Sequence, residues 1–420
     1  MYRIVYSINF ISNTFKYFIT AVKLIKIYYK DNMNKSVSKM KSLLNVVSPS
    51  LMRQVQHDIE QHRYDKIWRN RNDVVPVMPF LDIETTLLCN LRCPFCWWWG
   101  ESGLVPKMLE KKDPAVINPL TTEKIKKLMW DAKKLGTKTI HLSGAEPFMR
   151  KDTVELIEYG AQLGIDITIN TNGTLLDDAI LRRLAKVKNL SMVFSIDGPK
   201  DVHDSIRGKG VFDKVTTVIK KLAEYKGNNT SLRIETNTTF SPLIRGRVME
   251  LARFLDTLPI DNMTFQQLWF TTKEVAEVHK RFMKENFNIE DNGVDGHIIS
   301  MPQRIYIEEL IKEVDELSSA RFSKPLNFKP LIRSKQINLW YTDLHFVVRQ
   351  TCTAPWGTFV RVKTSGEVVF CPDDWVNYSI GNVHNESILE LWNNDKAKKF
   401  RHVLGKVGTF PACARCCILG

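Results

Sequence analysis

The feature that most limits what this chain can fold into is a group of three cysteines, Cys89, Cys93 and Cys96, spaced as CxxxCxxC. The apolar run from Val77 to Ile83 predicts a strand, so the thiols fall on a tight loop just after that strand. Three thiolates on one loop can hold three corners of a cubane iron–sulfur cluster and leave the fourth iron without a protein ligand. A zinc knuckle is the alternative, although zinc sites favour CxxC pairs that a fourth ligand closes.

The composition is that of a chain that buries a large core. With 420 residues, 44% of them hydrophobic and 25% charged, it suits one large domain and one or two smaller units. The net charge of +14 suggests an anionic partner, such as nucleic acid, a phosphorylated substrate, membrane headgroups or an acidic electron donor, without choosing among them. Of the eight cysteines, three are Cys89, Cys93 and Cys96 and five follow residue 350, which indicates metal binding in a reducing, cytoplasmic compartment.

Residues 1–72 predict a basic, helical N-terminal extension. Residues 10–29 are apolar but interrupted by Lys16, Lys23 and Lys26, so they make a poor membrane span. Their spacing predicts an amphipathic helix. Packing against the protein or a partner is the favoured interpretation, and a peripheral contact with a membrane surface is the alternative. Met33 is a second candidate for the natural start.

From Val77 onward, predicted strands and amphipathic helices alternate. The strands are Val77–Glu84, Thr137–Leu142, Asp166–Asn170, Ser191–Ile196, Leu232–Thr238 and Asn262–Leu268. The helices are Thr122–Leu135, Asp152–Leu163, Leu176–Lys186, Phe212–Tyr225 and Ile244–Leu255, and residues 271–345 predict a helical connecting region. This alternation implies an α/β fold with a parallel sheet, whose chemistry gathers at the carboxyl ends of the strands.

Short polar segments follow several of these strands. They are Ser143-Gly144-Ala145-Glu146-Pro147 after the second, Asn170-Thr171-Asn172-Gly173 after the third, and Ser195-Ile196-Asp197-Gly198-Pro199 with Arg207 after the fourth. Asn237 ends the fifth. Each segment also suits an ordinary turn or a solvated surface.

The cysteine spacing, with Phe95 before the last cysteine, and these segments in this order resemble the radical S-adenosylmethionine (radical SAM) enzymes over Val77 to Leu268. The resemblance implies a partial (β/α)6 TIM-like barrel over residues 73–270, with SAM bound to a [4Fe–4S] cluster on the three cysteines. It implies cofactor contacts from Phe95, Gly144, Ala145, Glu146, Pro147, Asn172, Ser195, Arg207 and Asn237. In SPASM-type maturases the matching serine and arginine hold the SAM carboxylate; Ala145 departs from the family by replacing a glycine.

A second set of cysteines, Cys352, Cys371, Cys413 and Cys416, lies in the last part of the chain. A hairpin predicted around Ser365-Gly366 would bring the first two together, and the terminal CxxC would complete a four-thiolate site. Zinc is again the alternative. Further segments, Gly381-Asn382-Val383 and Leu391-Trp392, resemble the SPASM/Twitch domains. The resemblance implies a small α+β domain over residues 346–420 with one auxiliary [4Fe–4S] cluster in the shorter Twitch form. Cys417 is a spare thiol, either unligated or substituting for Cys416.

The resemblance implies a reductive cleavage of SAM to a 5′-deoxyadenosyl radical that abstracts a substrate hydrogen. A fully ligated auxiliary cluster favours electron relay, and hence oxidation of a C–H or C–OH carbon in a sugar-like molecule or a peptide. Asp373 and Asp374 are candidates for the accompanying base, although either also suits a solvated surface. The expected electron donor is a small flavodoxin- or ferredoxin-type protein, and no nucleic acid is expected. Radical modification of a peptide or protein, and a non-enzymatic iron–sulfur or zinc regulator, are the alternatives.

Overall fold

The computed structural model describes residues 62–100, 103–290, 293–298, 304–330, 332, 334–371 and 376–416. The chain divides into two compact units, one of residues 1–66 with 318–321 and one of residues 67–317 with 322–420. The predicted amphipathic helix at 10–29 and Met33 lie outside the described residues, while residues 62–69 are helical. No helix in the described part of the chain is long and apolar enough to cross a membrane.

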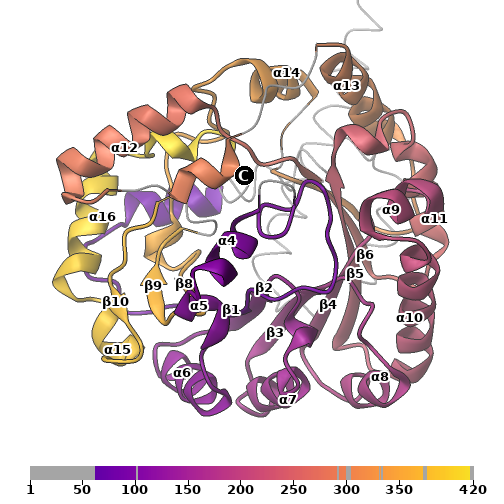
Figure 1. Cartoon of the computed structure of the whole chain (residues 1–420), viewed down its shortest axis with the longest axis horizontal. Helices are drawn as coiled ribbons and strands as arrows, with labels where there is room; N and C mark the ends of the chain where they lie inside the picture. The colour runs from indigo at the N-terminus through magenta and orange to yellow at the C-terminus, as the bar shows by residue number, and fades with distance from the viewer. Residues whose placement is uncertain are drawn as a thin grey trace, which may run out of the picture. The chain divides into compact units, whose positions relative to one another are not determined.

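The larger unit is built on a parallel α/β sheet, as the alternation of the sequence predicts (Figure 1). Its first strands are β1 (Phe80–Thr86), β2 (Thr139–Gly144), β3 (Asp166–Thr171), β4 (Leu190–Ser195), β5 (Leu232–Phe240) and β6 (Asn262–Gln267), paired in chain order. The helices between them are α6 (Thr122–Lys134), α7 (Thr153–Gln162), α8 (Asp178–Leu184), α9 (Lys200–Arg207), α10 (Val211–Lys226) and α11 (Val248–Thr257).

Strand alternation gives the sheet two different faces. On β1, Leu81 and Ile83 are fully buried in the core with Met129 of α6. The residues between them, such as Asp82, point to the opposite side because successive strand side chains alternate. We call this side, opposite the helices, the inner face.

The predicted helical region 271–345 needs a correction, because it also contains a strand. It holds α12 (Lys273–Phe287), the 3-10 helix η3 (Gly293–His297), α13 (Arg304–Ser319), β7 (Leu326–Lys329) and α14 (Ser334–Thr342). Strand β7 pairs parallel with β6, so the parallel run has a seventh strand. Four residues between Pro325 and Pro330 carry too short an alternation to indicate a strand on their own.

The predicted C-terminal hairpin is confirmed as β8 (Arg361–Val362) and β9 (Glu367–Val369), which pair antiparallel. The sequence did not predict that β8 also pairs parallel with β1, which makes one sheet of order β10-β9-β8-β1-β2-β3-β4-β5-β6-β7. The remaining elements are α4 (Leu104–Glu110), α5 (Pro114–Ile117), η1 (Pro147–Met149), η2 (Pro242–Ile244), η4 (Ala354–Trp356), β10 (Gly381–Asn382), α15 (Ile388–Leu391), α16 (Asp395–Val407) and η5 (Pro411–Cys413).

Candidate active site

The first cysteine loop follows β1 directly and folds into tight turns. The backbone N–H of Cys96 donates to the carbonyl of Cys93 at 3.0 Å, and that of Leu91 donates to the Cys89 sulfur at 3.3 Å. Burial raises the pKa of the Cys93 thiol to about 11, and that of Cys89 also rises. The negative charge of Cys96 adds to both shifts, and that of Cys89 adds to the shift of Cys93. Such buried thiols suit a cationic iron cluster, which would stabilise their deprotonated form.

The loop after β2 is hydrogen-bonded to the start of the cysteine loop. The N–H of Ala145 donates to the Thr86 carbonyl at 2.9 Å, and that of Glu146 donates to the Leu88 carbonyl at 3.0 Å. Gly144 has a φ of +117°, and a Cβ there would lie 2.2 Å from the Thr86 oxygen. Glycine is therefore required at 144, whereas Ala145 has no positive φ and its methyl group packs beside the cysteine loop.

We expect Gly144→Ala to displace this loop and to cost about 1–3 kcal/mol of stability, the usual strain of a residue in a disfavoured backbone conformation. SAM affinity should fall with it, because the loop supports the residues beside the first cysteines. Denaturant unfolding and calorimetric titration with SAM measure both effects. Ala145→Gly is the matched control and should change stability by no more than about 1 kcal/mol. Equal behaviour of the two variants would contradict the assignment.

Glu146 and Asn172 support the loops from inside. The Glu146 carboxylate is buried and accepts hydrogen bonds from the Thr171 hydroxyl at 2.8 Å and the Asn172 N–H at 2.7 Å. Burial raises the pKa of Glu146 although these hydrogen bonds oppose the shift. The Asn172 amide donates to Asn90 Oδ1 at 3.0 Å and lies 4.0 Å from the Cys89 sulfur. Both side chains thus connect the end of β3 to the loops above β1 and β2.

Arg207 lies beside the first thiols and is held by a residue that the sequence analysis did not single out for a role. Its Nε donates to Asp197 Oδ2 at 2.6 Å, and Asp197 is 1% exposed. Burial alone would lower the pKa of Arg207, but Asp197 and the thiolate of Cys93 raise it overall, so it stays charged. Asp197 also accepts the N–H of Thr239 at 3.0 Å. This pair fixes the guanidinium next to the cysteine loop.

The other predicted SAM contacts lie at the edge of the sheet formed by the carboxyl ends of its strands. We call this edge the rim. Ser195 ends β4 and lies in register with Asn237 of β5, whose amide donates to Gln266 at 3.4 Å. Phe95 is half-buried in the cysteine loop, and Pro147 is buried at the start of η1.

The inner face carries a buried ionic group that sequence reasoning missed. Asp82 is 0% exposed and accepts hydrogen bonds from Arg361 Nε at 2.6 Å, His141 Nδ1 at 2.7 Å and the Ser143 hydroxyl at 2.8 Å. Burial alone would raise the pKa of Asp82, but Arg361 and His141 outweigh it and hold the pKa at about 2. One signal in the sequence could have revealed this group. The charged residues Asp82 and Glu84 alternate with apolar residues in an otherwise buried strand.

The second cysteine set is partly assembled. The pKa of Cys413 is raised well above its usual value by burial and by the nearby Cys352 and Cys371. Cys416 follows within a turn, its N–H donating to the Cys413 carbonyl at 3.2 Å. Among the described residues no disulfide joins the seven cysteines, and no group of three or more His, Cys, Asp or Glu could hold a single metal ion. A cubane is less demanding, because each thiolate binds a different iron. Asp373, Asp374 and Cys417 lie outside the described residues.

The short helix η3 contacts residues next to both cysteine sets. Its Val294 packs with Ala276 and Ala412, and Cys371 packs against this small cluster. Its His297 ring lies 5.0 Å from the ring of Trp97, which follows Cys96 and stacks on Trp98 at 3.6 Å. Trp97, next to Cys96, and Ala412, next to Cys413, therefore both pack with η3.

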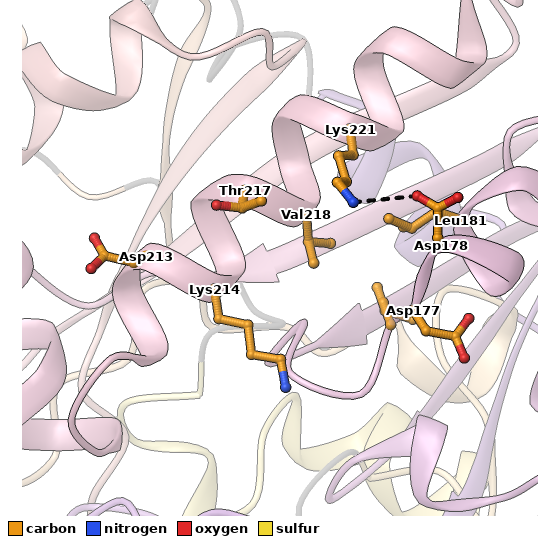
Figure 2. Close-up of a pocket in the computed structure, with 9 residues that line it drawn as sticks. Asp177, Asp178, Leu181, Asp213, Lys214, Thr217, Val218 and Lys221 are labelled. Atoms are coloured by element: carbon orange, nitrogen blue, oxygen red, sulfur yellow. Dashed lines mark hydrogen bonds and ion pairs between the residues drawn. The ribbon is translucent and has the colours of Figure 1, made fainter.

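A surface hollow lies away from these residues. It has a volume of about 420 Å³ and is lined by α8, α10 and the residues just before α8. Figure 2 shows its lining side chains, among them Asp178 and Lys221, which form an ion pair. None of the predicted site residues lines it. The predicted site residues lie instead at the rim of the sheet, and the buried carboxylate of Asp82 lies on its inner face.

A parallel strand–helix sheet with a three-thiol loop after its first strand and a second thiol group near its C-terminal strands is typical of iron–sulfur enzymes with auxiliary clusters. A model of the radical SAM superfamily matches residues 83–258, and a model of an iron–sulfur cluster-binding domain, SPASM, matches residues 352–417. The chain is a radical SAM enzyme with a C-terminal SPASM domain. Its cofactors are SAM, a [4Fe–4S] cluster and auxiliary iron–sulfur clusters in the SPASM domain.

Two curated relatives and one solved structure show the range of the family. The Fe-coproporphyrin III synthase of Methanosarcina barkeri is 25% identical over 345 residues, 80% of each chain. The mycofactocin maturase MftC of Mycolicibacterium smegmatis is 28% identical over 141 residues, 33% of each chain. Streptococcus suis SuiB bound to precursor peptide SuiA superposes with a TM-score of 0.54 at 16% identity, covering 92% of this chain and 78% of that one, which supports the fold.

Proposed function

We propose that this enzyme uses SAM to abstract a substrate hydrogen and completes a net oxidation of a C–H or C–OH carbon by returning one electron through the auxiliary cluster. The observation that supports this function best is the packing of Trp97 and Ala412, which are next to cysteines of the two sets, with the same helix η3. An auxiliary cluster near the site of radical formation can accept the electron that the substrate radical must lose.

The proposed ligands of the SAM cluster are Cys89, Cys93 and Cys96, and those of the auxiliary cluster are Cys352, Cys371, Cys413 and Cys416. Arg207 and Ser195 are proposed to bind the SAM carboxylate. An arginine recognises a carboxylate through two parallel hydrogen bonds, and the bond from Nε to Asp197 leaves both terminal nitrogens of Arg207 to donate. When bound, the clusters and SAM supply the radical chemistry, and the protein positions them and limits access of water.

Loss of the auxiliary cluster should uncouple SAM cleavage from oxidation. In Cys352→Ala/Cys371→Ala, 5′-deoxyadenosine should still form, while oxidised product should fall at least ~10-fold, equivalent to about 1.4 kcal/mol in the productive barrier. The substrate for this assay is a compound that increases 5′-deoxyadenosine formation by the wild type. The measured quantity is the ratio of oxidised product to 5′-deoxyadenosine. Circular dichroism of the variant controls for a collapsed domain. An equal loss of both activities in a folded variant would contradict electron return.

A second candidate is radical modification of a peptide, which the mycofactocin maturase and the peptide-bound SuiB favour. A basic N-terminal extension would then recognise the peptide. Deleting residues 1–72 should abolish peptide turnover and leave the iron content and the SAM cleavage without substrate unchanged. Peptide turnover by the shortened protein would exclude a recognition role for the extension.

A further inference from the structure

Helix α16 carries a row of basic side chains at the left edge of the view in Figure 1. Lys396, Lys399, His402 and Lys406 are all exposed and recur every three or four residues, which places them on one side of the helix. The opposite side is buried and packs into the core through residues such as Phe400. We call the four exposed residues the α16 stripe.

Most of the charge on the α16 stripe has no acidic partner. In the described part of the chain no ion pair involves its three lysines, while His402 Nδ1 lies 3.5 Å from Asp73 Oδ2. Arg71 is exposed beside the last turn of α16, where its Nη2 donates to the Gly405 carbonyl at 3.3 Å, and it adds a further positive charge. A surface of this charge attracts anionic partners and speeds their association.

The α16 stripe ends beside the second cysteine set. Helix α16 ends at Val407, and the carbonyl of the next residue, Gly408, accepts the backbone N–H of Cys352 at 2.9 Å. Cys413 follows shortly afterwards, in η5. All four thiols of this set are half-buried, so a cluster bound to them would lie close to the protein surface. A partner docked on the stripe would therefore lie near the auxiliary cluster.

This position favours an electron-carrying protein over other anionic partners. Electron transfer slows steeply with distance, so a carrier must dock directly beside the cluster that it serves. From Lys396 to Lys406 the stripe spans about 15 Å at about 1.5 Å per residue, which fits the small interfaces of electron-transfer complexes. A nucleic acid or a membrane surface would gain nothing from the adjacent thiols.

We propose that the α16 stripe docks a small acidic protein that carries one electron and holds it beside the auxiliary cysteines. This proposal rests on the proposed function, because a docked carrier is needed only if the auxiliary cluster exchanges electrons. In the balanced step one electron passes from the reduced auxiliary cluster to the oxidised carrier, and no atom is transferred. The cluster is oxidised and the carrier is reduced by that electron.

Docking is measured with the reconstituted full chain and an oxidised flavodoxin, an acidic protein that holds one flavin mononucleotide. In calorimetric titration at low salt, Lys399→Glu/Lys406→Glu should weaken binding at least ~10-fold, because two attractive charges become repulsive. Higher salt should weaken wild-type binding and reduce the difference between the two proteins. Lys214→Glu/Lys220→Glu is the matched control, since it makes the same change of charge at exposed positions of α10 and should bind as the wild type does.

Electron transfer provides the second readout. The same proteins are prepared with Cys89→Ala, Cys93→Ala and Cys96→Ala, so that only the auxiliary cluster is present, and are reduced with dithionite that is then removed. Stopped-flow absorbance follows oxidation of the cluster by flavodoxin or by duroquinone, a small neutral oxidant that needs no charged docking surface. In Lys399→Glu/Lys406→Glu the rate with flavodoxin should fall at least ~10-fold, while the rate with duroquinone stays within about twofold.

The two readouts separate a failed docking surface from a failed proposed function. Absence of wild-type binding, unchanged binding in Lys399→Glu/Lys406→Glu, or an equal loss in the α10 control overturns the docking assignment. Equal slowing with flavodoxin and duroquinone also overturns it, because the substitutions then act on the cluster itself. Tighter binding to duplex DNA or to phosphatidylglycerol vesicles than to flavodoxin overturns the choice of partner. Binding of flavodoxin without electron transfer to either oxidant overturns the proposed function instead.

Discussion

Replacing Cys89, Cys93 and Cys96 together by alanine should abolish SAM cleavage, lowering 5′-deoxyadenosine formation at least ~1,000-fold, or about 4 kcal/mol in the barrier. The reason is the absence of any other thiol group beside Arg207 in the described part of the chain. Without the first cluster, SAM would have no source of the electron that breaks its C–S bond. The measurement is 5′-deoxyadenosine released with dithionite and SAM alone.

Iron content provides the second readout of the same variant. The reconstituted wild type should bind roughly eight iron atoms and the triple variant about four, if each cysteine set holds one cubane. Cys417→Ala is the matched control, because the spare thiol should leave both iron and activity unchanged. Retention of roughly eight iron atoms by the triple variant would show that other residues hold the first cluster.

Breaking the buried pair between Asp82 and Arg361 should have the largest effect on stability. Arg361→Leu leaves an uncompensated carboxylate that is 0% exposed, which should cost about 3–5 kcal/mol. The double variant Asp82→Leu/Arg361→Leu should regain most of this loss, because it leaves neither partner charged. Urea unfolding of the three proteins measures both effects. A loss below about 1 kcal/mol in Arg361→Leu would mean that His141 and Ser143 suffice for Asp82.

The same carboxylate gives a pH dependence with a defined sign. The pKa of Asp82 lies at about 2 in the folded protein, below its ordinary value of 3.8. A lowered carboxyl pKa adds stability that is fully present above pH 3.8 and is lost as the pH falls toward about 2. Acid unfolding of Arg361→Leu should therefore begin at a higher pH than that of the wild type.

The parallel sheet and the rim of the candidate site could be predicted because their signals are local. Strand and helix periodicity located β1 to β6 within a few residues of their observed bounds, and the polar segments after the strands marked the rim. The register of parallel strands then brings Ser195 beside Asn237, as carboxyl-end clustering implies.

The remaining features depend on contacts between distant parts of the chain. The ion pair of Asp82 with Arg361 joins residues 279 positions apart, and neither neighbourhood indicates the other. His141 lies within a strand, where its surroundings suggest a half-buried polar residue and nothing more. Strand β7 becomes a strand because β6 offers it an edge, since its own four residues carry little pattern.

The pairing of β8 with β1 affects how the gene could have been assembled. A SAM-binding barrel produced without residues 346–420 would expose the edge of β1, with its unpaired N–H and C=O groups, and would leave Asp82 without Arg361. Exposed strand edges promote pairing between molecules and aggregation. The C-terminal part therefore acts as a wall of the barrel, and exchanging it by recombination for another domain would require a replacement strand and a new counter-charge in the same event.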